Sequence, residues 1–154
     1  MKIELIKARL SDIENMQRLV SPEVESGVIL IRSSDEIATN IRSYILAKED
    51  DGEIVGFCAL HIHASSLAEI RSLIVKENKR DKGIGESLVL KALDEAKALG
   101  LQKVLSLTYK QSFFEKLGFV EIPKESIPEH KIWADCIKCK HFPVCNEVSL
   151  IKTL

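Results

Sequence analysis

The sequence predicts one α/β domain in which a mixed β-sheet carries helices on both faces. Three observations predict this class. Helix signals near the N-terminus precede a run of strand-like segments joined by tight turns over residues 44–75. A turn with two glycines then leads into an amphipathic helix that stops at Gly100, and a strand–helix–strand unit follows. This order implies a sheet with both parallel and antiparallel neighbours.

The first part of the chain is expected to form a strand and two helices. Residues 2–10 alternate polar and apolar, which predicts the strand. Two S-x-x-E capping boxes mark helix starts, Ser11 with Glu14 and Ser33 with Glu36. The first helix should end near residues 21–22, because the residue before a proline is pushed out of helical geometry. The second, short helix should run over residues 35–42.

Strands and tight turns should occupy the middle of the chain. Strands are predicted over residues 44–48, 54–63 and 67–75. Asp51 and Gly52 are expected to form a two-residue hairpin turn in which both residues have positive φ.

The sheet should be completed by a strand–helix–strand unit after Gly100. We expect a short buried strand (103–108), a short helix (112–117) and a last strand (119–122). From Pro123 onward the pattern breaks down. We therefore assign residues 1–122 to the domain and residues 123–154 to a cysteine-containing extension packed on it.

Composition and charge exclude several classes of function. The chain has 154 residues with 22 basic and 23 acidic side chains, so it lacks the basic footprint of a nucleic-acid-binding or membrane-surface protein. Its N-terminus has no signal-peptide core, and its apolar runs are too short to span a bilayer. We expect a cytoplasmic protein whose cysteines are reduced thiols, and any anion that it binds must be held by a local site.

The turn Arg80-Asp81-Lys82-Gly83-Ile84-Gly85 lies between a strand and a helix. Its glycines let backbone N–H groups converge beside the positive end of the helix dipole, which suits a pyrophosphate. An ordinary strand-to-helix turn fits the same two glycines. A P-loop is excluded because Gly-Lys-Ser/Thr is absent, and a dinucleotide fingerprint would need a third glycine or alanine where Leu88 stands.

Two motifs together resemble the signature of the GNAT superfamily of acyl-CoA N-acyltransferases. The pattern R-x-x-G-x-G follows a strand that ends in Leu73-Ile74-Val75. Phe114-Glu115-Lys116-Leu117-Gly118-Phe119 resembles the second landmark of the family, (F/Y)-x-x-x-G-F. The resemblance covers residues 2–122. It implies the GNAT acyl-CoA N-acyltransferase fold, with a mostly antiparallel sheet splayed at one parallel pair and acetyl-CoA as co-substrate.

The same resemblance implies which residues contact acetyl-CoA. The pantetheine arm would lie along Leu73, Ile74 and Val75, where a backbone N–H near Ile74 would polarise the thioester carbonyl. The residues that would wrap the pyrophosphate are Arg80, Asp81, Lys82, Gly83, Ile84, Gly85, Glu86 and Ser87. The residues that would border the other wall are Leu107, Phe113, Phe114 and Lys116.

A general base is also implied, because the acceptor ammonium must lose a proton before it attacks. Glu69 matches the position at which many of these enzymes place that base. A strand carboxylate paired with Arg71 or a lysine is the alternative. His61 and His63 share one face of a strand and could be a base or metal pair, or simply exposed or hydrogen-bonded histidines.

The general acid for the departing thiolate is left unassigned. Many family members have a tyrosine where this chain has Phe114. Tyr109, Ser112 or water are the substitutes that the sequence offers.

Further stretches are similar to the short stand-alone bacterial N-acetylglutamate synthases. They are Gly27 to Ser33, Leu105 to Thr108, and the tail from His130 to Val148. This resemblance implies acetyl transfer to the α-amine of L-glutamate, the entry step of arginine biosynthesis. The implied acceptor-binding residues are Leu30, Arg32, Arg71 and Lys131. Arg32 is the best carboxylate ligand because its guanidinium can bind bidentately, and solvated surface charges are the alternative.

Other functions stay open at this point. The same chemistry could act on another amino acid, a small amine or a protein lysine. A non-catalytic acyl-CoA-binding module is the rival from a different class, because the family's tyrosine is absent. The expected partner is a small-molecule amine, with no nucleic acid and no membrane, and a homodimer is left open.

Three tail cysteines have a spacing that could bind zinc, with two histidines nearby: Cys136, Cys139, Cys145, His130 and His141. A Cys3His site would staple the tail, whereas reduced thiols packed under it fit the same sequence. The fourth cysteine, Cys58, is expected in the core.

Overall fold

A computed structural model describes residues 2–26, 33–123, 126 and 148–154 of the chain. In this part, one sheet contains the strands β1 (Ile3–Lys7), β2 (Tyr44–Glu49), β3 (Ile54–Ala64), β4 (Leu67–Val75), β5 (Lys103–Thr108), β6 (Val120–Ile122) and β7 (Val148–Thr153). The helices are α1 (Ile13–Ser26), α2 (Ser34–Thr39), α3 (Ile84–Leu99) and α4 (Gln111–Lys116), with short 3-10 turns η1 (Leu10–Asp12), η2 (Ile41–Ser43) and η3 (Glu77–Lys79).

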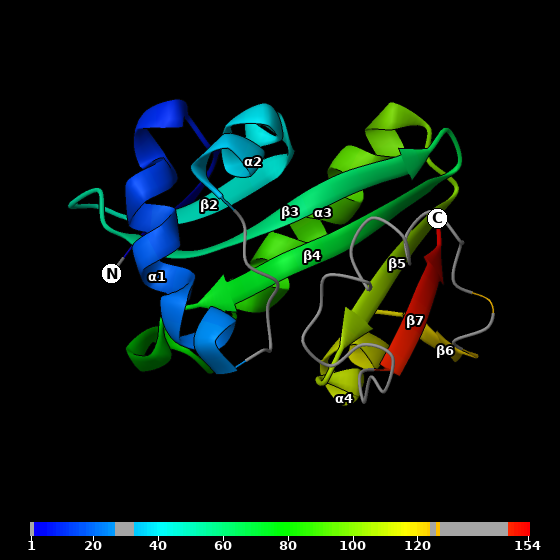
Figure 1. The fold of residues 1–154 in the computed structure, drawn as a ribbon. Coiled ribbons are helices and arrows are strands. Elements are labelled where there is room, and N and C mark those ends of the chain that lie inside the picture. The colour runs from blue at the N-terminus through cyan, green and yellow to red at the C-terminus, as the bar shows by residue number, and fades with distance from the viewer. Residues whose placement is uncertain (1, 27–32, 124–125, 127–147) are drawn as a thin grey trace.

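The sheet is mostly antiparallel and contains one parallel pair. Its strand order is β1-β2-β3-β4-β5-β7-β6, and β4 pairs with β5 in parallel. That pairing covers only the first three residues of β4, ending where Glu69 lies opposite Leu105. Beyond this point the two strands separate toward their C-terminal ends (Figure 1). The predicted fold class, a mixed sheet that diverges at one parallel pair, is confirmed.

Helices cover both faces of the sheet, as expected (Figure 1). The apolar stripe of α3, with Leu88 and Val89 fully buried, packs on the face formed by Leu60, Ala68 and Ile70. The core on the opposite face includes residues of α1, α2, β3 and β4, among them Met16, Ile37, Phe57 and Ile74. None of the helices described here is long and apolar enough to cross a membrane.

The N-terminal helix starts and ends at different residues from those predicted. Its first turn is η1, and the capping carboxylate is the buried Asp12, which accepts the N–H of Arg9 at 2.9 Å, so the expected Ser11–Glu14 box is wrong. The helix also continues through Pro22 to Ser26. Proline removes one N–H donor, and the hydroxyl of Ser21 donates to the Arg18 carbonyl at 3.4 Å in its place. The Ser33 cap of α2 is confirmed, because its hydroxyl accepts the Glu36 N–H at 3.1 Å.

The β2–β3 hairpin has a three-residue turn and not the two-residue turn that Asp51-Gly52 predicted. Gly52 has a φ of +87°, but Asp51 is not among the residues with positive φ. The Gly52 N–H donates to the Glu49 carbonyl at 2.9 Å, and Glu49 N–H donates to the Glu53 carbonyl at 3.0 Å. This is a type I turn followed by a left-handed glycine, the next commonest hairpin solution.

The strand predicted at residues 119–122 is confirmed as β6 (Val120–Ile122), but the expectation that it is the last strand is wrong. β7 pairs antiparallel with β5 on one side and with β6 on the other. Its Leu150 is fully buried in the core. The C-terminal residues 148–153 therefore belong to the central sheet.

Candidate active site

β4 contains a bulge just beyond the point where it leaves β5. Ser72 has a φ of +59°, and the register with β3 shifts between the Ala59–Arg71 and Phe57–Ile74 pairs. One extra residue in β4 reverses which side chains face α3. Before the bulge, Ile70 packs in the α3 core, and Glu69 and Arg71 lie on the opposite face. After the bulge, the odd-numbered residues Leu73 and Val75 pack against the α3 core.

Gly56 on β3 permits this bulge. A Cβ at Gly56 would lie 2.9 Å from the carbonyl oxygen of Ile74, closer than real Cβ atoms come. The Ile74 carbonyl therefore points toward β3. Because the N–H and C=O of one strand residue point to the same edge, the backbone groups that face β5 belong to Leu73 and Val75.

The turn after β4 holds several backbone donors at the start of α3. Asp81 has a φ of +62° and Gly83 a φ of +80°, and both conformations are left-handed. The N–H groups of Ile84, Gly85 and Glu86 occupy the first turn of α3, where no intrahelical acceptor exists for them. Arg80 Nε donates to the Val75 carbonyl at 3.0 Å, which ties the turn to the end of β4. This geometry suits an anion at the helix N-terminus.

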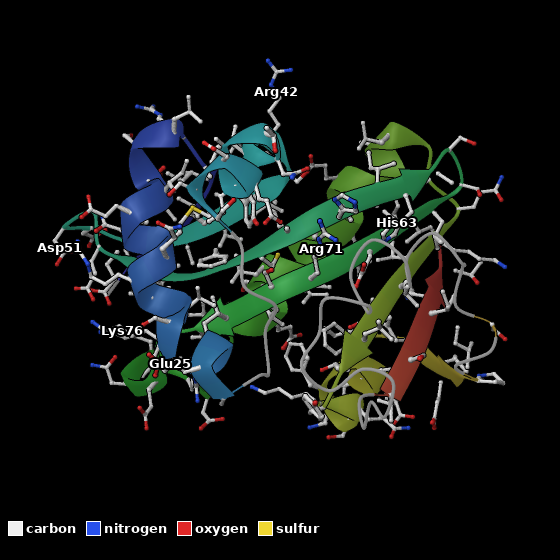
Figure 2. All side chains as sticks on the ribbon, in the orientation of Figure 1. Glu25, Arg42, Asp51, His63, Arg71 and Lys76 are labelled. Carbon is white, nitrogen blue, oxygen red and sulfur yellow. The ribbon has the colours of Figure 1, made fainter. Side chains whose placement is uncertain are left out.

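The segment before the turn is held against the β2–β3 hairpin. Lys79 forms an ion pair with Glu49 at 2.7 Å, and Lys76 forms one with Glu53. The hydrogen bond from Lys79 to the Glu49 carboxylate raises the pKa of this lysine. The N–H of Lys76 also donates to the Val55 carbonyl at 2.7 Å. Figure 2 shows Lys76 near the end of β4, at the same end of the sheet as Asp51 in the β2–β3 turn.

The phenylalanines of α4 adjoin the same turn. A Cβ at Gly85 would lie 3.6 Å from the Phe113 ring and 3.6 Å from the Val75 side chain. The start of α3 is therefore packed close to both α4 and the end of β4. Phe114 is only 3% exposed and packs edge-to-face against both Phe113 and Phe119. It has a core position, and Phe113 is the ring nearer the turn.

Glu69 is buried at the last position of β4 that pairs with β5, and it forms a hydrogen bond with a histidine. His63 Nε2 lies 2.9 Å from Glu69 Oε1, and the two side chains are 2% and 3% exposed. One partner of Glu69 thus comes from the neighbouring strand β3. A buried carboxylate beside a hydrogen-bond donor is a suitable acceptor for a substrate proton.

A second polar contact, between Arg71 and His61, lies beside the Glu69–His63 pair. Arg71 Nη2 lies 3.0 Å from His61 Nδ1, and the rings of His61 and His63 meet edge-to-face with centroids 4.8 Å apart. Figure 2 shows His63 and Arg71 over the β3–β4 pair. The two histidines, considered above as a base or metal pair, are therefore hydrogen-bonded to a carboxylate and a guanidinium.

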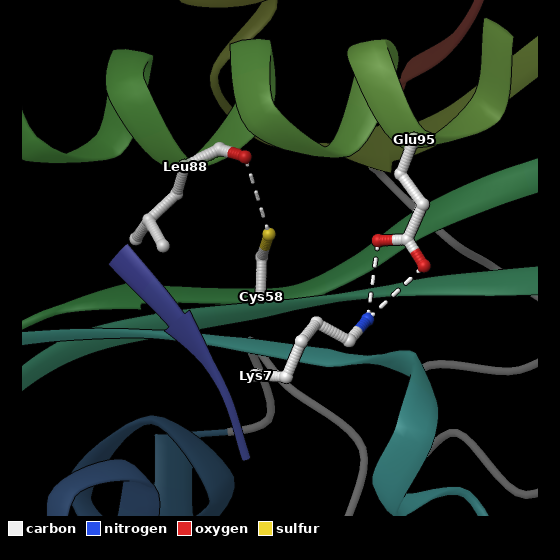
Figure 3. Close-up of polar contacts among 4 residues, drawn as sticks. All are labelled: Lys7, Cys58, Leu88 and Glu95. Atoms are coloured by element: carbon white, nitrogen blue, oxygen red, sulfur yellow. Dashed lines mark hydrogen bonds and ion pairs between the residues drawn. The ribbon is translucent and has the colours of Figure 1, made fainter. Parts of the chain in front are cut away.

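Cys58 lies in the core on the α3 face, as expected. Its thiol is fully buried, and Sγ lies 3.7 Å from the Leu88 carbonyl (Figure 3). Burial raises the pKa of Cys58 to about 12, so the group is a neutral thiol. The nearby Lys7–Glu95 ion pair, at 3.1 Å, links β1 to α3 over the same region (Figure 3).

Several predicted site residues lie outside the described part of the chain. They are Leu30, Arg32, Lys131, Cys136, Cys139 and Cys145. Among the residues that the structure does describe, no group of three or more His, Cys, Asp or Glu side chains could hold a metal ion.

Comparison with known proteins identifies the family. The acetyltransferase (GNAT) family model matches residues 10–119. The chain belongs to the GNAT acetyltransferase family. It is 40% identical to an uncharacterized N-acetyltransferase of Chlorobaculum tepidum over 96% of this chain and 94% of that protein. It is also 34% identical to an amino-acid acetyltransferase of Mycobacterium tuberculosis over 75% of this chain and 67% of that one.

Solved structures of GNAT proteins superpose on the whole fold. Rv2747 of Mycobacterium tuberculosis, solved in complex with CoA, is 25% identical with a TM-score of 0.83 over 98% of this chain and 99% of that one. N-acetylglutamate synthase from Neisseria gonorrhoeae, complexed with coenzyme A and N-acetyl-glutamate, has a TM-score of 0.86 at 24% identity, and this GNAT chain corresponds to 35% of it. Resemblance to the N-acetylglutamate synthases is therefore confirmed at the level of the fold.

The contact of Glu69 with His63 was not predicted from the sequence. Counting back from the turn at Ala64 and Leu67 would place Ile62 opposite Glu69. A register shift between Ile62 and Ala64 instead places His61 opposite Glu69 and brings His63 within reach of the carboxylate. No local pattern in the sequence marks this shift.

Proposed function

We propose that this GNAT N-acetyltransferase moves the acetyl group of acetyl-CoA to the α-amine of an amino acid, with L-glutamate as the preferred acceptor. The observation that carries the proposal is the position of Glu69. It is a buried, hydrogen-bonded carboxylate at the point where β4 and β5 part, on the strand that leads to the anion-binding turn.

The residues after β4 fit the anionic part of acetyl-CoA. The unpaired N–H groups of Ile84, Gly85 and Glu86 would hold the diphosphate, and Lys82 adds a positive charge beside them. A Cβ at Gly83 would have nothing within 4 Å, so this face of the turn is open to a ligand. Arg80, Asp81 and Ser87 are proposed to shape the turn around the phosphates.

The backbone of β4 would hold the pantetheine arm and the thioester. Leu73 and Val75 carry the backbone groups that face away from β3, and the arm would pair with them as an added strand does. One of these N–H groups, next to Ile74, would donate to the thioester carbonyl oxygen. Leu107, Phe113 and Lys116 are proposed for the opposite wall, together with the buried Phe114.

Glu69 would accept the proton of the acceptor ammonium, directly or through a water. It lies four residues before Leu73, about 13 Å along an extended strand at 3.3 Å per residue, which leaves room for the acceptor amine and a bridging water. An arm that runs along β4 from the turn therefore brings the thioester toward Glu69. The neutral amine would then attack the carbonyl carbon, the C–S bond would break, and a remaining proton of the attacking nitrogen would pass to the CoA thiolate, so that CoA leaves as the thiol.

Arg71 is proposed as a carboxylate ligand for the acceptor. It lies two residues after Glu69 on the same face of β4, and its guanidinium can bind a carboxylate bidentately. From the resemblance to N-acetylglutamate synthases, Leu30, Arg32 and Lys131 are proposed to complete the acceptor site. Relatives named amino-acid acetyltransferase support this class of acceptor. Acetylation of glutamate would place the protein at the entry of arginine biosynthesis, which fits the cytoplasmic location expected from the sequence.

A turnover assay with a panel of amines tests the proposal. CoA release would be followed with a thiol reagent while acetyl-CoA is held constant and each amino acid, a polyamine and a lysine peptide are offered in turn. We expect glutamate to give the highest kcat/KM. Preference for another amine would keep the chemistry and replace the acceptor, whereas binding of acetyl-CoA without turnover on any amine would favour a non-catalytic acyl-CoA-binding module.

A further inference from the structure

His61 and His63 form a row of contacts with Glu69 and Arg71, and the chemistry proposed above gives neither histidine a role. His61 lies directly opposite Glu69, and the other two side chains come from neighbouring positions of the same two strands, β3 and β4. The contacts run from Arg71 to His61 at 3.0 Å, from His61 to His63 between rings, and from His63 to Glu69 at 2.9 Å. A row of this kind constrains which nitrogen of each ring carries a proton.

The contact with Arg71 fixes the state of His61. A guanidinium has donors and no acceptor, so Arg71 donates and His61 Nδ1 accepts. His61 is therefore a neutral imidazole with its proton on Nε2. Its ring meets the ring of His63 edge-to-face at an interplanar angle of 71°, which holds the second imidazole in place.

The contact with Glu69 fixes the donor atom of His63. An ionised carboxylate only accepts hydrogen bonds, so a base-competent Glu69 requires the proton of His63 on Nε2. Both side chains are almost fully buried, and a buried carboxylate without a donor is strongly disfavoured in its charged form. Loss of His63 would therefore remove a hydrogen-bond donor from the charged form of Glu69.

We propose that His63 is a positioning residue for Glu69 in acetyl transfer, an inference that rests on the proposed function. Its Nε2–H donates to Oε1 and holds the carboxylate ionised and in one orientation. The acceptor ammonium gives its proton to the carboxylate of Glu69, and His63 keeps its own proton throughout. His61, fixed by Arg71, holds the ring of His63.

Two substitutions at His63 separate this role from packing. His63→Leu keeps an apolar side chain of similar size but removes the donor. His63→Gln restores an N–H that reaches about as far as the ring Nε2. We expect His63→Leu to lower kcat by about 10- to 100-fold, the range for loss of a charge-assisted hydrogen bond, with an unchanged KM for acetyl-CoA. His63→Gln should recover activity to within about threefold of wild type, because the donor is retained.

A double-mutant cycle with Glu69→Gln shows whether the effect passes through the carboxylate. If His63 acts through Glu69, His63→Leu should cost less than about twofold in kcat in the Glu69→Gln background. Equal losses in His63→Leu and His63→Gln, or the same loss of kcat in both backgrounds, would overturn the positioning role. Circular dichroism and calorimetric titration with acetyl-CoA confirm that each variant is folded.

A spectroscopic measurement on the wild type does not depend on turnover or on the folding of variants. Nitrogen-15 NMR of the imidazole rings at neutral pH should show His63 protonated at Nε2 and His61 unprotonated at Nδ1. An unprotonated Nε2 on His63 would overturn the proposal. Absence of wild-type turnover on every amine, with these ring states observed, would contradict the proposed function and leave the hydrogen-bond assignment intact.

Discussion

Gly83 gives the sharpest test of the anion-binding turn, because the chain contains a matched control. Gly83 and Gly52 have φ values of +80° and +87°, and a Cβ at either position would have no heavy atom within 4 Å. Replacement by alanine therefore introduces the same left-handed backbone strain at both sites without a steric clash inside the protein. We expect Gly83→Ala and Gly52→Ala each to lower the free energy of unfolding by about 1–2 kcal/mol.

The two variants should differ in ligand binding. The new methyl group at Gly83 would project beside the N–H groups of Ile84 and Gly85, where the diphosphate is proposed to lie. Loss of one charge-assisted hydrogen bond corresponds to about 1.5–3 kcal/mol, or roughly a ten- to hundredfold weaker Kd for CoA. The Gly52→Ala variant, whose substitution lies in the β2–β3 turn, should bind CoA as the wild type does. Calorimetry measures Kd and chemical denaturation measures stability, and equal CoA affinity in both variants would refute the placement of the diphosphate.

Two further predictions concern the acceptor and the core. Arg71→Lys should raise the KM for glutamate about ten- to hundredfold, because a lysine cannot bind a carboxylate bidentately, and should leave the KM for acetyl-CoA unchanged. Steady-state kinetics measure both constants. An unchanged KM for glutamate would exclude Arg71 as a ligand of the acceptor. Cys58, with a pKa raised from 9.0 to about 12, should react with a thiol reagent at pH 8 roughly a thousandfold more slowly than an ordinary thiol, since only the thiolate reacts. This rate is measured in a variant with serine at the other cysteines, Cys136, Cys139 and Cys145; rapid native-state labelling would contradict the burial of Cys58, and unfolding in denaturant should restore it.

The parts of the fold that were predicted correctly depend on local signals. The helix α3 has an apolar stripe of helical period and a glycine stop, and both operate within a few residues. The strands β3 and β4 follow from β-branched runs flanked by turns. The splay of one parallel pair was expected only through the family resemblance, and no local pattern marks the bulge at Ser72 or the divergence after Glu69.

The errors have identifiable physical causes. Pro22 was expected to end α1, but the hydroxyl of Ser21 replaces the missing donor and the helix continues. β7 was missed because its pairing with β5 and β6 is decided by distant strands, although Val148, Leu150 and Ile151 form a strand-like run. The contact of His63 with Glu69 depends on the register shift between Ile62 and Ala64, which no local pattern in the sequence marks.

The central claim is that this GNAT enzyme acetylates an amine with Glu69 as the base. The most direct measurement is the pH dependence of kcat for the wild type and Glu69→Gln, with glutamate as acceptor. Removal of a general base costs on the order of 10²–10⁴ in rate, and higher pH should recover part of it because more of the amine is already neutral. We expect that loss in kcat together with an unchanged Kd for acetyl-CoA. Wild-type kcat and an unchanged pH profile in Glu69→Gln would contradict the claim.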